Sequence, residues 1–488
     1  MGPTHSQAFR RYIPNQIQTS ICQIHIVFPV TPLNFFPDRH FTQFSPPPAN
    51  CPNYLPSKLA REIRIKGFLD MRMKGSIMSE VDFISNLPCS IIENILGCLP
   101  LRDIVRTSIL SREWRYKWIT CPEIVFDFWF DQMFLGGHRL ETLVHQILKL
   151  HKGLLLRFAL LVPDLKSSHH IDQWIHLLPK NTLQDLTLHV SRGDNHKLPS
   201  DIYAFQNLRN LKLYNCAFNP PSGFKGFSKL ENLDLQNVVL VPETFGKFFA
   251  SCPAVERLRL VHCTSFDCLE IVGPKLKYLE FHGLLRSISF EKCPLLKDVK
   301  ISFSSMDFKR GNRFSIDLVK SLSSLPALEE LQLQAYALED LVEYGAPKKL
   351  PVALRTLKTL HLSDMYFEKI QEIACAICFI RSSPSLQKLK ITAFTSDVVD
   401  SVLEFLRSQK SSDTLTHLKT VTMQLFSGNE SEMEFIKYLL SSATELEEMS
   451  IAPHSGSVFD EEESILNELK QFPRASPRAE IINSDKMQ

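Results

Sequence analysis

The hexapeptides LRNLKL (208–213) and LENLDL (230–235) decide the fold of this 488-residue chain. Each reads apolar-x-x-apolar-x-apolar, and its last three residues alternate as in a strand that buries one face. Ten further matches to the pattern begin at Leu155, Leu183, Val255, Leu276, Leu296, Leu328, Leu357, Leu386, Leu418 and Leu446. One such strand cannot bury its apolar face alone, so we predict stacked units that share a continuous core.

This succession is typical of leucine-rich repeats. We predict an α/β fold in which an irregular solenoid spans residues 150–410, with a parallel sheet on its concave face. Steps of 20–25 residues between Leu208 and Leu296 leave room for 3₁₀ or loop returns, and later steps of 28–32 residues leave room for helices. One predicted helix lies in FEKIQEIACAICFIRSSP, where an apolar face would comprise Phe367, Ile370, Ala374 and Ile377.

Residues 1–78 differ from the rest in their prolines, aromatic residues and lack of periodicity. Three interpretations stay open: a transit peptide, because Asp38 is the only acidic residue up to residue 60; a disordered extension; or a gene product that naturally starts at Met71, Met73 or Met78. We favour the last two interpretations.

The bulk composition gives no sign of a nucleic-acid or membrane partner. Net charge is +2, and no apolar run reaches the roughly 18–20 residues that span a bilayer. The stretch LLLRFALLVP is short, carries Arg157 and reads as a buried strand. Twelve scattered cysteines favour reduced thiols, which predicts the cytoplasm, the nucleus or both.

No motif for catalysis, cofactor or metal binding is apparent, so we expect a protein that is not an enzyme. Phosphate-loop, nucleophile-elbow and zinc-protease patterns are all missing from the sequence. We expect Cys375 and Cys378 to pack within a helix, and Cys263 and Cys268 to bracket a structural loop. We place the pair His169-His170 in a polar loop, and FDEEES near Phe459 at a helix start.

The stretch LPCSIIENILGCLPLRDIVRTSILSREWRYKW, which begins at Leu87, predicts a small helical module. Pro88 suits the first turn of a helix that Gly97 ends, and Asp103 suits the first turn of a second helix. Ser111 would cap a third helix that carries two tryptophans. About 35 residues cannot bury all these apolar side chains internally, so the rest of the chain or a partner must cover some of them.

The module resembles the F-box, whose pattern matches Leu87-Pro88, Ile91-Ile92, Leu99-Pro100, Asp103, Ser111 and Trp114. We assign residues 82–122 to it. The resemblance implies docking to a Skp-type adaptor, and through it to a cullin and a RING protein. The implied adaptor-binding residues are Leu87, Pro88, Ile91, Ile92, Ile95, Leu96, Leu99, Pro100, Ile104, Val105 and Trp114.

A second resemblance covers the C-terminal part. His417–Ile451 is similar to the FBD region that follows leucine-rich repeats in plant F-box proteins, with recurring positions at Gly428, Glu432, Glu434, Tyr438, Leu439 and Leu440. We predict a helix over Met433–Leu440 between two strands, an FBD-type region over 411–482 that continues the solenoid, and a tail over 483–488.

Together these resemblances imply a substrate-recognition subunit of an SCF-type ubiquitin ligase, which acts by bringing a target close rather than by catalysis. Mixed charges on the concave face favour a protein target. The target-binding candidates are His189, Lys212, Tyr214, Gln236, Arg259, His282, Gln332 and His361. The alternatives are a binding scaffold that acts outside the ligase and a receptor for a small molecule.

Overall fold

The computed structural model describes residues 87–109, 114–127, 130, 138–264, 266–303, 314–334, 350, 352–394, 399–409, 414–453 and 459–483. The predictions for residues 1–78 and for Ser111 lie outside these ranges. The chain divides into two compact units, Met1–Cys98 and Leu99–Gln488, and each is described by itself.

In the first unit the described residues form one helix, α4 (Cys89–Gly97). Pro88 precedes it, and the Pro88 carbonyl accepts hydrogen bonds from the amides of Ile91 and Ile92. Proline serves here because the amide it lacks would have no partner in a first helical turn. The helix ends at Gly97, as predicted from the sequence.

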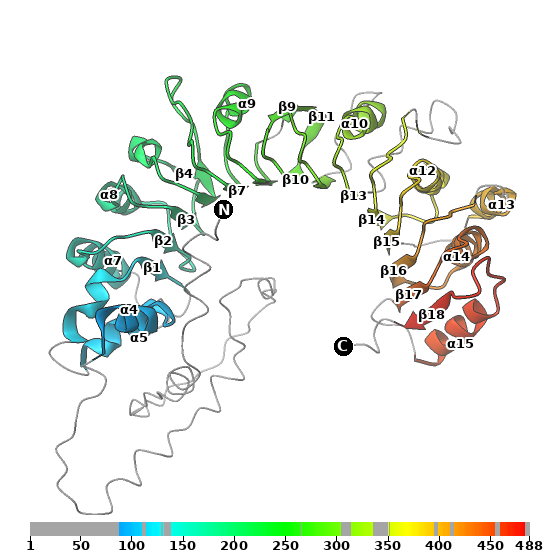
Figure 1. Cartoon of the computed structure of the whole chain (residues 1–488), viewed down its shortest axis with the longest axis horizontal. Helices are drawn as coiled ribbons and strands as arrows, with labels where there is room; N and C mark the ends of the chain where they lie inside the picture. Colours follow the sequence, from blue (N-terminus) through cyan, green and yellow to red (C-terminus); the bar gives the residue numbers. More distant parts are fainter. Residues whose placement is uncertain are drawn as a thin grey trace, which may run out of the picture. The chain divides into compact units, whose positions relative to one another are not determined.

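The second unit is built on one parallel sheet of 14 strands among its described residues, which confirms the predicted solenoid. The strands follow chain order, and Figure 1 shows them lining the inner side of the repeat array with the helices outside. They are β1 (Glu123–Phe126), β2 (Arg157–Leu160), β3 (Asp185–His189), β5 (Asn210–Tyr214), β7 (Asn232–Gln236), β8 (Arg257–Val261), β10 (Tyr278–Gly283), β12 (Asp298–Phe303), β13 (Glu330–Gln334), β14 (Thr359–Met365), β15 (Lys388–Ala393), β16 (Thr420–Phe426), β17 (Glu448–Pro453) and β18 (Glu480–Asn483).

The return segments between these strands are mostly helical. The α-helices are α5 (Leu101–Arg106), α7 (His138–Leu150), α8 (His169–Leu177), α9 (Pro242–Ala250), α10 (Phe314–Ser323), α12 (Ile370–Arg381), α13 (Asp400–Ser408), α14 (Glu430–Ser442) and α15 (Phe459–Lys470). The 3₁₀ helices are η3 (Thr107–Ile109), η4 (Trp114–Thr120) and η5 (Ser200–Ala204).

The core follows the hexapeptide pattern. Leu208, Leu211 and Leu213 have no exposed surface, and the matching positions of the other repeats are buried in the same cluster. Strands β2 and β3 pair in register, which places Phe158 beside Leu186 and Leu160 beside Leu188. The stretch LLLRFALLVP is therefore the buried strand that was predicted.

The short returns differ from the prediction in two places. The 25-residue step from Leu230 to Val255 contains a full helix, α9, because PETFGKFFA begins with proline and buries three phenylalanines. The next two steps return through strands β9 (Phe266–Val272) and β11 (Leu285–Glu291), which pair with each other. Cys268 is therefore an exposed strand residue and not the end of a loop.

Two helix predictions also need correction. Helix α12 is buried on nearly all sides from Glu372 to Ile380, whereas the sequence suggested a single apolar face. Phe367, which was predicted to lie on that face, is in the turn before the helix. His169 and His170 begin helix α8, and the His170 ring lies 3.0 Å from the Glu141 carboxylate. The helix predicted near Phe459 is present as α15.

The F-box segment is less regular than predicted. The second helix, α5, stops at Arg106, and Ser108 and Ile109 lie in the 3₁₀ helix η3. The segment from Trp114 that was predicted as a third helix is η4, also a 3₁₀ helix. The first sheet strand, β1, starts only three residues after η4 ends, ahead of the boundary predicted at residue 150.

Candidate protein-binding surfaces

Helix α4 carries two apolar stripes at helical spacing. Ile92 and Leu96 are 2% and 1% exposed, so their side chains are not accessible to a partner in this structure. Ile91 and Ile95 form the second stripe, and each is partly exposed. Leu87 and Pro88 come before the helix begins; Leu87 is partly exposed and Pro88 is exposed. Of the adaptor-binding candidates in the first unit, these four residues are open to contact.

The later F-box candidates belong to the second unit. Leu101 of α5 is part of the solenoid core, and Val105 and Trp118 pack against that core. Ile104 and Trp114 are 4% and 2% exposed. The solenoid unit therefore covers much of this segment itself.

The accessible candidates at the start of this unit are Leu99, which is partly exposed, and Pro100, which is exposed. Sequence reasoning missed Tyr116, whose side chain on η4 is 63% exposed. Only its position between Trp114 and Trp118 in the sequence could have drawn attention to it. The role of each of these residues in adaptor binding stays a prediction.

All eight target-binding candidates lie on the inner side of the sheet, opposite the buried positions. Strand register places Lys212, Arg259, Gln332 and His361 in one row that crosses the strands. His189, Tyr214, Gln236 and His282 lie in the next row. The structure thus brings these residues onto one continuous surface, and their role in target binding stays a prediction.

The central part of this inner face pairs its own charges. The Arg259 guanidinium lies 3.0 Å from the Glu280 carboxylate and 3.6 Å from the Asp234 carboxylate. Gln236 donates to Asp234 at 3.1 Å, and the Tyr278 hydroxyl donates to Glu280 at 2.6 Å. A partner would therefore meet charged groups here that already pair with one another.

The inner-face histidines lose basicity through burial. Burial lowers the pKa of His189 and His282. Burial and the nearby Lys390 and Lys300 charges lower the pKa of His361 to about 4. At neutral pH these rings are uncharged, so lysines and arginines supply the positive charge of this face.

The described residues offer no candidate metal site. They contain no group of three or more His, Cys, Asp or Glu residues that could hold a metal ion. Cys375 and Cys378 are buried, as expected, and burial raises the pKa of Cys378 to about 11, which suppresses the reactive thiolate. None of the described helices is long and apolar enough to cross a membrane.

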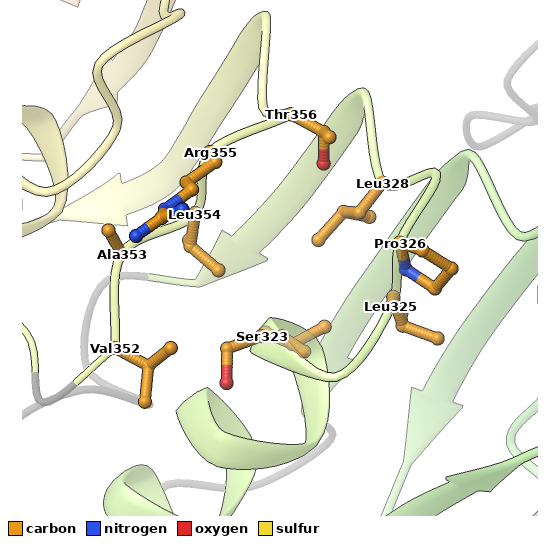
Figure 2. Close-up of a pocket in the computed structure, with 10 residues that line it drawn as sticks. Ser323, Leu325, Pro326, Leu328, Val352, Ala353, Leu354, Arg355 and Thr356 are labelled. Atoms are coloured by element: carbon orange, nitrogen blue, oxygen red, sulfur yellow. The ribbon is translucent and has the colours of Figure 1, made fainter.

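A cavity of about 280 Å³ lies between the end of α10 and residues 352–356. Figure 2 shows that leucine, proline and valine side chains dominate its lining, with Arg355, Thr356 and Ser323 as the polar members. It contains no carboxylate, histidine or cysteine that could act as a base or nucleophile. A cavity of 190 Å³ occupies the corresponding place after α12, at Ile380–Leu386 and Thr414–Leu418, so the hollow is a repeat feature.

Two recurring positions of the C-terminal region, Gly428 and Glu432, have a structural role. Gly428 has a φ of +77°, and a Cβ there would lie 2.4 Å from the Ile465 side chain. The Glu432 carboxylate is fully buried and accepts hydrogen bonds from the Ser427 and Gly428 amides at 2.9 and 2.8 Å. Helix α14 contains the predicted Met433–Leu440 helix and lies between strands β16 and β17. Gly428 and Glu432 therefore build the turn into α14.

Comparison with known families agrees with this architecture. Three family models match the chain: the F-box domain at residues 84–124, the LRR repeats of FBD-associated F-box protein At5g56370 at 171–391, and FBD at 414–451. The matches have the same order along the chain as the structural regions described above.

Two relatives match most of this chain. F-box/FBD/LRR-repeat protein At1g13570 of Arabidopsis thaliana is 33% identical over 427 residues, which cover 82% of this chain and 98% of that protein. F-box/LRR-repeat protein 13 of the same plant is 24% identical, with 84% and 98% covered. The family names indicate adaptor-type proteins rather than catalysts, and the chain belongs to the plant F-box/FBD/leucine-rich-repeat protein family.

Proposed function

We propose that this chain is the substrate-recognition subunit of an SCF-type E3 ubiquitin ligase. Its F-box would dock a Skp-type adaptor, and its solenoid would hold a protein target for ubiquitination. The observation that carries the proposal is the union of an F-box at 84–124 with a sheet that has 14 strands among the described residues and a polar inner side. Such a subunit works by proximity, because it raises the concentration of target lysines near a charged E2 enzyme.

The accessible stripe on α4 gives the proposal a direct test. Leu87→Glu with Ile91→Glu places one charge just before α4 and one on its partly exposed stripe, and leaves the buried Ile92 and Leu96 unchanged. We expect at least a tenfold loss of affinity for a plant Skp-type adaptor, since interfaces depend on a few central apolar residues. Affinity would be measured by titration of the purified adaptor onto the intact chain.

The matched control is Glu93→Lys, an exposed position on the same helix but off the stripe. It should bind the adaptor like the unchanged chain. Circular dichroism and thermal melting would establish that all variants fold. Failure of the unchanged, folded chain to bind any such adaptor would refute the ligase proposal and favour a scaffold that acts outside the ligase.

A further inference from the structure

We infer that the inner face of β14, β15 and β16 binds an extended acidic segment of the target protein, with an apolar side chain of that segment seated at the strand ends. The inference rests on the proposed function and specifies the chemistry of its target. The surface, here called the β14–β16 patch, comprises Lys388, Lys390, Tyr366, Phe394 and Leu425.

The lysines of this patch carry charge without a counterion. Lys388 and Lys390 both project from the inner side of β15, because the alternate residues Leu389 and Ile391 are buried. Neither lysine forms an ion pair with a described residue. Strands β14–β16 contain one carboxylate, Asp364, and it accepts a hydrogen bond from Gln334 at 2.8 Å.

Neighbouring positions add hydrogen-bond donors but no negative charge. Register places Thr359 and Thr420 beside Lys388, and His361 and Thr422 beside Lys390. Neighbouring strands are about 4.8 Å apart, so these hydroxyls lie within reach of a group bound between the lysines. The lowered pKa of His361 is caused first by burial and then by Lys390 and Lys300, which agrees with a positive local potential. A carboxylate is the complementary group.

The apolar part lies where the same strands end. Phe394, directly after β15, is 55% exposed, and its ring centroid lies 5.1 Å from that of Tyr366, directly after β14. Leu425 of β16 is 40% exposed and has a φ of 54° in a bulge of the β16–β17 ladder. A leucine in the left-handed region is uncommon and costs free energy, so an exposed leucine held there suits a binding role.

Charge complementarity favours this patch over the central strands as the binding site of an acidic segment. In the centre, Arg259 already contacts both Asp234 and Glu280, so an acidic ligand would have to displace those pairs. At β15 an acidic ligand meets lysines that have no such competitor. The apolar rim favours a segment that combines carboxylates with a leucine or phenylalanine rather than a uniformly charged tail.

The test uses the intact chain bound to its adaptor and synthetic 12-residue peptides as probes. One peptide sets Asp and Glu around a leucine, and its counterparts replace the acids with Asn and Gln, with Lys, or with phosphoserine. We expect the acidic peptide to bind at least about tenfold more tightly than the amide version, with an affinity that falls as salt rises.

Variants locate the site. Lys388→Glu with Lys390→Glu should weaken the acidic peptide at least tenfold, whereas Lys225→Glu with Lys247→Glu should not. Lys225 and Lys247 are exposed lysines outside the patch, and this control makes the same change in net charge. If the first pair fails to fold, Lys388→Gln with Lys390→Gln replaces it, with the same expected direction.

Leu425→Gly separates binding from stability. Glycine accepts a φ of 54° readily, so the thermal midpoint should hold or rise while binding of the peptide leucine weakens. The inference is overturned if the lysine variants bind like the control pair, if the amide peptide binds as well as the acidic one, or if only the phosphoserine peptide binds. Adaptor binding measured in parallel distinguishes these failures from failure of the proposed function.

Discussion

The central and C-terminal parts of the solenoid solve the same packing problem in different ways. Between Val255 and Leu296 the repeats are 21 and 20 residues long, and the chain returns through the paired strands β9 and β11. Between Leu357 and Leu446 the repeats are 28–32 residues long and return through α12, α13 and α14. Repeat length therefore sets the kind of return, because a strand crosses the outer side with fewer residues than a helix.

The longer repeats bring polar groups into the interior. Glu372 and Glu432 are both fully buried, and each is the third residue of its helix. Each carboxylate accepts a backbone amide from the turn before the helix: Glu372 from Tyr366 at 2.8 Å, and Glu432 from Ser427 and Gly428. A carboxylate in a first turn also suits the helix dipole. The C-terminal part therefore depends on hydrogen bonds to buried carboxylates, whereas the returns through β9 and β11 do not.

The largest expected effect is at Glu432. Glu432→Ala leaves the Ser427 and Gly428 amides and the Ser427 hydroxyl without this acceptor, at a cost of about 3 kcal/mol in the free energy of unfolding. Hydrogen exchange should show loss of protection in β16 and β17 and little change in β8 and β10. Glu430→Ala, an exposed first-turn change on the same helix, should cost about 0.5 kcal/mol. Equal losses at both positions would contradict this account of the turn.

A smaller expected effect distinguishes the central part of the inner face from its C-terminal part. Arg259→Met removes the cation shared by Asp234 and Glu280 and should cost about 1 kcal/mol, since these groups are partly shielded from water. Lys390→Met removes a lysine without an ion pair among the described residues and should change stability by less than about 0.5 kcal/mol. Chemical denaturation of the two variants measures the difference. A loss at Lys390 as large as that at Arg259 would mean that Lys390 has a stabilising role.

Much of the fold could be predicted because it depends on a periodic signal. The strand positions follow from leucines such as Leu211 and Leu213, whose spacing alone places them in the core. The alternation in each strand also placed Lys212 and His361 on the opposite, inner side. The helix of the C-terminal region was predicted for the same reason.

Other features depend on contacts that periodicity does not report. The burial of α12 on nearly all sides comes from neighbouring repeats, so its own apolar face could not reveal it. Phe245, Phe248 and Phe249 stabilise a helix in a step that seemed too short for one. The Lys388 and Lys390 pair was missed as a site because its significance is the scarcity of carboxylates on β14 and β16, where Asp364 is the one present. These strands are distant from β15 in sequence and adjacent to it only in the sheet.

The smallest expected effect concerns protonation of His361. Its folded-state pKa of about 4 lies below the ordinary 6.5, so the unfolded chain binds a proton at higher pH than the folded chain. The resulting stability is fully present above about pH 6.5 and is lost as pH falls toward 4. Lys390→Met removes one of the charges that lower this pKa, so the pKa should rise by less than about 0.3 units, equivalent to less than about 0.4 kcal/mol. NMR titration of the His361 ring measures the shift, with Lys247→Met as the control that should leave it unchanged. An unchanged pKa in Lys390→Met would show that the Lys390 charge does not lower it and would remove one support for a positive potential at the β14–β16 patch.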